Sequence, residues 1–409
     1  MTQRRAFLTL CGANFFVYGL NAIYNCFIPL YLDKYFDEIA VGALLSIGPV
    51  IMILSPILWG IATDRAKKKN NILMLIVAFA AVSFFALGIY RSFLWCAVML
   101  AVFMFFSAPY GGLVDTLTLE AAANSGIKYG PPRMMGTVGY GIIAIVVSLI
   151  PSSNELLLFS SYSIAAVAGI FFLKISPAVA GHDRREKGAN AKTEQVKTAQ
   201  EEGAGIQTLT ELLKNRGMII ILIVIFVMLF VFSYYSNFMP QYMTQNLGLP
   251  TWVWGITVFV TLTLEFPFFI WFDKIMTKVG LRRLLIITSV VCTARHFLLS
   301  FAKDPVTILI TSALTGAFAT VSIYCGTCYI NAAVAPRIRA SSQSMMYAVS
   351  YGAPKVIAGI GGGIMTKYLG VPASYILCGI MCAACIVVSL CFKDKGAGRG
   401  GCANFLKKV

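Results

Sequence analysis

Long apolar segments, separated by short polar stretches, run through almost the whole chain. Each has about 20 or more residues, enough for an α-helix to cross the roughly 30 Å hydrocarbon layer of a bilayer. Barrel strands are shorter, and backbone exposed to lipid must satisfy its own hydrogen bonds, so helices are expected. The pattern predicts twelve transmembrane helices, at residues 8–33, 39–63, 71–90, 93–121, 132–151, 155–176, 217–245, 251–276, 282–302, 305–333, 341–368 and 372–393.

A polar stretch interrupts this pattern near the middle of the chain. Residues 182–202 are charged, rich in Ala and Gln and free of aromatic residues, which is typical of a disordered linker. Six predicted helices lie on each side, so we expect an all-α membrane protein of two pseudo-symmetric bundles. Its predicted parts are an N-terminal six-helix bundle (1–176), a cytoplasmic linker (177–216), a C-terminal six-helix bundle (217–393) and a cytoplasmic tail (394–409).

Composition and charge support a membrane protein. The chain is 58% hydrophobic and 12% charged, whereas soluble domains are about 45–50% apolar and about 25% charged. The net charge of +16 does not indicate nucleic-acid binding, because the basic residues fall between apolar segments. By the positive-inside rule we expect a multi-pass protein of the cytoplasmic (inner) membrane with both termini in the cytoplasm. Only four basic residues fall in the opposite loops: Lys34, Arg91, Lys303 and Lys367.

The sequence shows no chemistry typical of an enzyme. No Walker loop, nucleotide fingerprint, metal-ligand cluster or nucleophile triad stands out. The pairs Cys325/Cys328 and Cys382/Cys385 mimic a CxxC motif, but on apolar helices we interpret them as packing residues. We therefore expect no enzymatic activity, no cofactor and no metal. The expected partners are a small-molecule solute, protons and the lipid bilayer, and we expect a monomer.

The loop after the second predicted helix carries a charged motif. Gly60 precedes Asp64, Arg65 and three lysines, and a weaker copy in the second half contains Asp273 and Arg282. The motif resembles the loop signature of the major facilitator superfamily. Gly60 is expected to allow close helix contact. Asp64, at a helix end, is expected to accept hydrogen bonds from a base or a helix N-terminus and so hold one conformational state.

The fifth predicted helix opens with a more specific motif. Residues 129–140 contain an aromatic-Gly pair, then Arg133, Met, Gly, Val and Gly, and end at Tyr140, while residues 27–32 form a Phe/Pro/aromatic run. Both segments resemble the lactose permease group and the wider oligosaccharide, nucleoside and phenylpropionate proton symporters. The resemblance implies a twelve-helix transporter with two bundles.

The resemblance also implies a substrate site. In this group an acid on helix 4 pairs with the helix 5 Arg, and the following aromatic residue stacks on the sugar ring. The matching residues are Asp115, Arg133 and Tyr140. Ionised residues inside a membrane are costly, so they are usually paired and face a cavity. An Arg–carboxylate pair can exchange hydrogen bonds with solute hydroxyls; a purely structural ion pair is the alternative.

The second half contains four candidate proton-coupling residues. Glu265 and Arg295 match an acid and an Arg of the group's substrate and proton pathway. The group's helix 10 also carries a His and an acid, which residues 314–318 lack, so the coupling ion stays open. His296 is the other candidate, although adjacent helix residues point about 100° apart and are not expected to face one spot. Lys355 is expected to pair with Glu265 or line the cavity; snorkelling is the alternative.

Polar residues at helical spacing form stripes on four predicted helices, and a shared wet pathway explains them better than separate helix contacts. From these stripes we add Tyr18, Asn21, Asn237 and Thr261 to the candidate substrate site. The stripes consist of Asn14, Tyr18, Asn21 and Asn25; Tyr234, Asn237 and Gln241; Trp254, Thr257, Thr261 and Glu265; and Ser344, Tyr347, Tyr351 and Lys355.

We therefore expect a proton-coupled symporter that imports a small hydroxylated solute, a sugar or oligosaccharide first, by rocking of two halves around a midplane site. Asp115 and Arg133 would bind hydroxyls, Tyr140 would stack on the ring, and Glu265 would carry the proton. The alternatives are a nucleoside or aromatic-acid symporter, a drug/proton antiporter, or a non-transporting solute sensor on the same fold.

Overall fold

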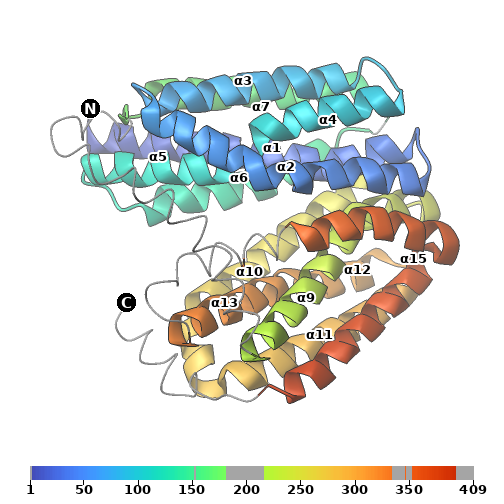
Figure 1. The fold of residues 1–409 in the computed structure, drawn as a ribbon. Coiled ribbons are helices and arrows are strands. Elements are labelled where there is room, and N and C mark those ends of the chain that lie inside the picture. Colours follow the sequence, from blue (N-terminus) through green and yellow to red (C-terminus); the bar gives the residue numbers. More distant parts are fainter. Residues whose placement is uncertain (1, 152, 181–215, 334–345, 347–351, 393–409) are drawn as a thin grey trace. The chain divides into compact units, whose positions relative to one another are not determined.

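Apart from turns and short connections, the chain is helical wherever the computed structural model describes it (Figure 1), namely over residues 2–151, 153–180, 216–333, 346 and 352–392. Eight helices in these ranges are long and apolar enough to cross a membrane. The first half contains α1 (Gln3–Asp33), α2 (Glu38–Arg65), α3 (Lys69–Leu87), α4 (Phe93–Ser107), α5 (Tyr110–Asn124), α6 (Gly130–Ser148) and α7 (Glu155–Ile175). The second contains α9 (Arg216–Gln241), the π-helical turn η3 (Tyr242–Asn246), α10 (Thr251–Val279), α11 (Leu281–Phe301), α12 (Pro305–Ala313), α13 (Thr315–Ala333) and α15 (Ala353–Leu390).

Some predicted helices are divided in the structure, and two others are joined. The segment 93–121 is divided into α4 and α5 next to Pro109, which cannot donate a backbone hydrogen bond. The segment 305–333 is divided at Leu314 into α12 and α13. In the opposite sense, α15 runs through the predicted gap at 369–371, where Gly370 has φ of 74° and Pro372 follows. Gly tolerates this backbone conformation, so the chain kinks there.

Polar caps explain where four helices begin. The side chain of Asp37 accepts a hydrogen bond from the Ala40 amide at 3.0 Å, and Ser92, Asn154 and Asp304 act in the same way before α4, α7 and α12. Such caps satisfy amide donors that have no partner within the helix. These caps fix the N-terminal ends of α2, α4, α7 and α12, each of which follows a connecting segment.

Residue contacts divide the chain into two compact units. The first comprises Met1–Ala191 and Pro240–Phe259, and the second Lys192–Met239 and Val260–Val409. The bundle boundaries expected from the sequence stay a prediction. In the first unit, α1 packs against α6 and α7. Gly139 permits this approach, since a Cβ there would lie 2.2 Å from the Phe15 carbonyl oxygen.

Each unit has a well-packed interior. In the first, aromatic side chains from α4 and α7 surround Phe84 of α3, whose ring centroid lies 4.3 Å from that of Tyr162. In the second, α11 packs along α15 and also contacts α12 and α13. These helix pairs provide rigid supports for the polar groups described next.

Candidate functional site

Three helices of the first unit bring Tyr18, Asp115 and Arg133 together, and we call these residues the Arg133 site. Arg133 lies in the first turn of α6, and its Nε is 2.7 Å from Asp115 Oδ1 on α5. The Tyr18 ring of α1 lies under the guanidinium, 4.2 Å from Cζ to the ring centroid. Gly136 makes room for this ring, because a Cβ there would lie 2.5 Å from Tyr18 Cδ2. The pairing expected from the sequence is therefore present.

The Arg133 site stays open to its surroundings. The side chains of Arg133 and Asp115 are 31% and 32% exposed. An ion pair with this exposure keeps donors and acceptors that can hydrogen-bond to a hydroxylated molecule. The Tyr18 ring adds an apolar face beside the charged pair. Charge, planar hydrogen-bonding groups and an aromatic ring thus meet at one place.

A second polar contact joins α1 to α6 near the Arg133 site. Asn25 Nδ2 donates to the Asn21 carbonyl at 2.9 Å and lies 3.0 Å from the Tyr140 hydroxyl. Tyr140 is half-buried. The sequence predicts a polar stripe along α1 that contains Tyr18, Asn21 and Asn25. This stripe lies on the side of α1 that meets α5 and α6.

In the second unit, a buried cation is surrounded by polar groups, and we call it the Arg295 cluster. Arg295 is fully buried on α11. Its Nε donates to the Thr311 carbonyl at 2.9 Å, and its Cζ lies 4.3 Å from the Tyr235 ring centroid. Thr261, from the predicted substrate set, donates to the Ser312 carbonyl at 3.1 Å. Tyr235 and Ser312 are joined through their hydroxyls at 2.7 Å.

Arg295 and His296, which were not expected from the sequence to face one spot, are in contact with each other. Arg295 Nη1 lies 3.2 Å from His296 Nε2. The Cβ atoms of adjacent helical residues diverge, but the long Arg side chain bends back to reach its neighbour's ring. The Arg guanidinium has only donors, so His296 Nε2 accepts in this contact.

The other predicted residues of the second unit are less closely defined. Glu265 on α10, Asn237 on α9 and Lys355 near the start of α15 are all half-buried. The remaining members of the last polar stripe, Ser344, Tyr347 and Tyr351, lie outside the described residues. These residues keep their predicted roles as proposals.

The charged loop motif forms an ion-pair group in the first unit. Lys69, which is buried, places Nζ 2.7 Å from Glu120 and 3.5 Å from Asp64. Asp64 thus lies next to a base, as expected, whereas Arg65 is exposed. The expected close contact at Gly60 is absent from the described structure: a Cβ there would meet no atom within 4 Å.

In the second copy of the motif, the side chain of Asp273 lies outside the described set. Arg282 donates from Nη2 to the Leu390 carbonyl at 2.6 Å, which joins the start of α11 to the end of α15. A base after the motif therefore binds a helix C-terminus, where cations are favoured.

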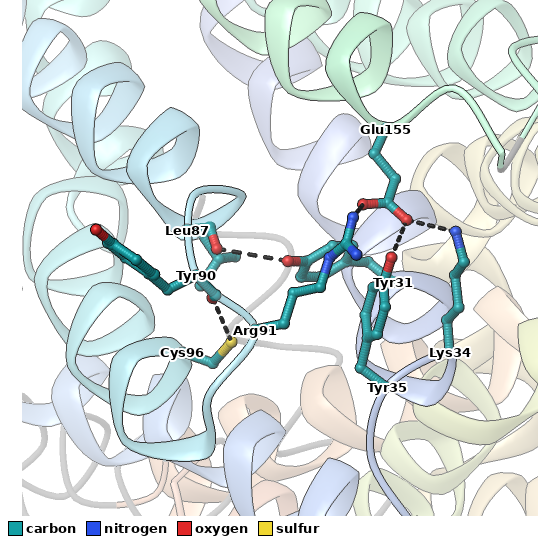
Figure 2. A network of polar contacts seen from close by, with 8 residues as sticks. All are labelled: Tyr31, Lys34, Tyr35, Leu87, Tyr90, Arg91, Cys96 and Glu155. Carbon is teal, nitrogen blue, oxygen red and sulfur yellow. Dashed lines mark hydrogen bonds and ion pairs between the residues drawn. The ribbon is translucent and has the colours of Figure 1, made fainter.

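Sequence reasoning missed a polar network around Glu155 (Figure 2). Glu155, at the start of α7, binds Lys34 and Tyr35, which follow α1, and its second oxygen lies 3.3 Å from Arg91 Nη2 in the α3–α4 loop. Tyr31 beside it donates to the Leu87 carbonyl. The sequence signal was present, since Lys34 and Arg91, two of the four bases predicted in the opposite loops, both bind this acid.

Two groups of this network have shifted pKa values. The hydrogen bond to Glu155 raises the pKa of Lys34 above its ordinary value. Burial, and then the hydrogen bond to Glu155, raises the pKa of Tyr35. Because both pKa values are raised, Lys34 and Tyr35 keep their protons at high pH. Their bonds to Glu155 therefore persist until the solution is strongly alkaline.

Comparison with known proteins decides the family. Residues 7–377 match the MFS_1 like family. The chain belongs to this family. Among curated relatives of this MFS-type chain, the uncharacterized transporter YwbF of Bacillus subtilis (strain 168) is 23% identical over 384 residues, covering 93% of this chain and 92% of the relative. The maltose permease of Geobacillus stearothermophilus is 22% identical, covering 86% and 85%.

Solved structures show the same MFS fold. The nucleoside transporter NupG aligns with a TM-score of 0.78 and 19% identity, covering 95% of this chain and 98% of that one. The peptide transporter POT aligns with a TM-score of 0.65 and 13% identity, covering 94% and 93%. The chain is therefore a multi-pass membrane transporter with the twelve-helix MFS fold, and not an enzyme.

Proposed function

We propose that this transporter imports a small hydroxylated solute together with a proton, and that a sugar or oligosaccharide is its first candidate cargo. The Arg133 site carries this proposal. An ion pair about one-third exposed, above an aromatic ring, offers hydrogen bonds to hydroxyls and an apolar surface to a sugar ring. Tyr140, oriented by Asn25, would stack on the same ring.

The relatives favour cargo of this chemistry. One is named as a maltose permease and another as a nucleoside transporter. Maltose and nucleosides both carry hydroxylated sugar rings. At identities near 20% these names do not transfer, but they select the compounds to test first. The nucleoside is our second candidate because a nucleoside transporter has the same fold over nearly the full chain.

Proton coupling is proposed for the second unit. Glu265 is half-buried on α10, and a carboxylate in such a place changes its ionisation when its exposure and neighbouring charges change. In this proposal Arg295, His296 and Lys355 would supply the neighbouring polar and cationic groups. The protein would act as a monomer in the cytoplasmic membrane, with both termini in the cytoplasm, and would transport by alternating access. Asn21, Asn237 and Thr261 stay proposed solute-binding residues.

Uptake into proteoliposomes tests this function. Labelled maltose, a nucleoside and an aromatic acid are each offered with and without an inward proton gradient. We expect accumulation of one hydroxylated solute that stops when a protonophore collapses the gradient. Uptake of the aromatic acid alone, or export of solute, would contradict the proposal in favour of an alternative transporter. Binding without counterflow would indicate a sensor.

The proton carrier is tested in the same vesicles. Glu265→Gln is expected to abolish proton-driven accumulation while leaving solute counterflow, since exchange of bound solute needs no net proton transfer. Glu38→Gln, an acid in the first turn of α2 with no assigned role in transport, is the matched control. Full accumulation by Glu265→Gln would show that another group carries the proton.

A further inference from the structure

Cys292, His296 and Cys382 bring three metal-binding atoms together inside the second unit, and we call them the thiol–imidazole cluster. The Cys292 sulfur lies 3.3 Å from the Cys382 sulfur and 3.5 Å from His296 Nδ1. The two sulfurs and a ring nitrogen all lie within 4.8 Å of one another. All three residues are fully buried.

Two packed helices hold these atoms in place. Cys292 and His296 are one turn apart on α11, so they share a face of that helix. Cys382 projects from α15, which packs along α11. Residues four apart on a helix are a recurrent way to present two ligands to one metal ion. Cys382 on the facing helix α15 provides the third ligand atom.

Both ring nitrogens of His296 have polar neighbours. Nε2 lies 3.2 Å from Arg295 Nη1, which can only donate, so Nε2 accepts. Nδ1 therefore carries the proton and donates to the Cys292 carbonyl at 2.8 Å. Neutral imidazole is the form that binds metals, and a backbone carbonyl is a common orienting partner. His296 Nδ1 is the nitrogen near Cys292 Sγ, so coordination through it would replace its hydrogen bond to the Cys292 carbonyl. The ring proton would then move to Nε2, and Arg295 Nη1 would have to release that atom.

The spacing of the cluster fits a thiophilic ion. In tetrahedral zinc sites Zn–S is about 2.3 Å and Zn–N about 2.0–2.1 Å, so neighbouring ligand atoms lie roughly 3.5–3.8 Å apart. The two distances from Cys292 Sγ, 3.3 and 3.5 Å, need only small shifts to reach this geometry. Thiolate ligands select Zn²⁺, Cu⁺ and related soft ions over Mg²⁺ or Ca²⁺.

We propose that Cys292, Cys382 and His296 bind one thiophilic metal ion of the zinc class and thereby join α11 to α15. Each thiol releases its proton on binding, so two thiolates balance a divalent charge. Three protein ligands leave a fourth position for water or another small ligand. This site goes beyond the transport function proposed above and does not depend on it.

Cadmium binding to the purified, reduced transporter tests the site. Cd²⁺ is the probe, because its thiolate complexes absorb in the ultraviolet, and Mg²⁺ is the non-thiophilic comparison. After desalting, elemental analysis should find one tightly held Cd²⁺ per chain and a higher unfolding temperature, since binding to the folded state stabilises it. Retention of no Cd²⁺ would overturn the proposal.

Variants assign the bound ion to these residues. Cys292→Ser, Cys382→Ser and His296→Asn should each weaken Cd²⁺ binding at least tenfold. Cys385→Ser removes a buried thiol from the same helix, outside the cluster, and should leave binding unchanged. An equal loss in Cys385→Ser, or full binding in the Cys292→Ser/Cys382→Ser double variant, would overturn the assignment.

A measurement on the unmutated protein tests the site even if the variants fail to fold. Alkylation after slow denaturation, read by mass spectrometry, should show Cys292 and Cys382 protected by Cd²⁺ and both free without it. If the two are already oxidised to a disulfide and no metal is held, the thiols would form a cross-link instead, and the metal proposal would be wrong.

Discussion

Two arginines of this transporter, Arg133 and Arg295, lie in opposite environments. Arg133 is about one-third exposed and contacts one carboxylate and one ring. Arg295 is fully buried, and protein groups already bind its Nε and Nη1. A cation with open donors can exchange them with a solute, whereas a cation enclosed by its own protein mainly holds helices together. This difference supports our proposal that the first unit binds solute and that Arg295 has a structural or coupling role.

The largest expected effect follows from removing the open cation. Arg133→Gln deletes a charge-assisted contact to solute, so we expect solute uptake to fall about 100-fold, equivalent to about 2.7 kcal/mol. Initial uptake rates in proteoliposomes measure this loss. Arg5→Gln, an exposed residue at the start of α1, is the matched control and should keep normal uptake. Uptake by Arg133→Gln within threefold of the unmutated protein would remove Arg133 from the site.

The buried cation should behave in the reverse way. Arg295→Gln leaves the Thr311 carbonyl and His296 without their partner, which should cost about 2–3 kcal/mol of folding stability. Arg133→Gln, whose side chain is partly solvated, should cost less than about 1 kcal/mol. Thermal unfolding of both variants in one detergent measures the contrast. Equal losses of stability would mean that exposure does not separate the two residues.

Packing beneath the Arg133 site gives a smaller effect. A Cβ at Gly136 would lie 2.5 Å from Tyr18 Cδ2, so Gly136→Ala should displace the Tyr18 ring from Arg133 at a cost of about 1–2 kcal/mol. We expect weaker solute binding by roughly tenfold. Gly112→Ala is the control, because a Cβ there meets no atom within 4 Å. Unchanged binding by Gly136→Ala would show that the ring position is unimportant.

The smallest expected effect concerns the Glu155 network of Figure 2. Glu155→Gln should lower the stability by about 1 kcal/mol, because its partners Lys34 and Arg91 are largely exposed. The pKa of Lys34 is raised in the folded state, so its contribution is complete below the ordinary Lys pKa of 10.5 and is lost as the pH rises through the folded value.

Unfolding midpoints from pH 7 to pH 11 check this dependence. The difference between unmutated protein and Glu155→Gln should stay constant to about pH 10 and shrink above it. A difference that grows with pH would give the wrong sign for Lys34.

The sequence predicts the local pattern of this fold well and its exceptions less well. Apolar length identifies the spanning segments, and residues such as Asp37 and Asn154 mark where helices start. Breaks at Ala108–Pro109 and Leu314 and the kink at Gly370 are harder to predict, because tertiary packing decides whether a helix stops or continues there.

The candidate site shows the same limit. The Asp115–Arg133 pair follows from a specific motif and two intramembrane charges. The meeting of Arg295 with His296 depends on how one long side chain bends, and the Cys292–Cys382 contact depends on the packing of two helices 90 residues apart in the chain. Residue spacing along a single helix predicts neither how a side chain bends nor how two distant helices pack.

Solute binding by purified protein, with and without Arg133, is the most direct test of the transport site. Thermal shifts are measured with maltose, nucleosides and aromatic acids, because a ligand that binds the folded state raises the unfolding temperature. We expect one hydroxylated, ring-containing solute to stabilise the unmutated protein and not Arg133→Gln. Equal stabilisation of both proteins by that solute would place the binding site elsewhere.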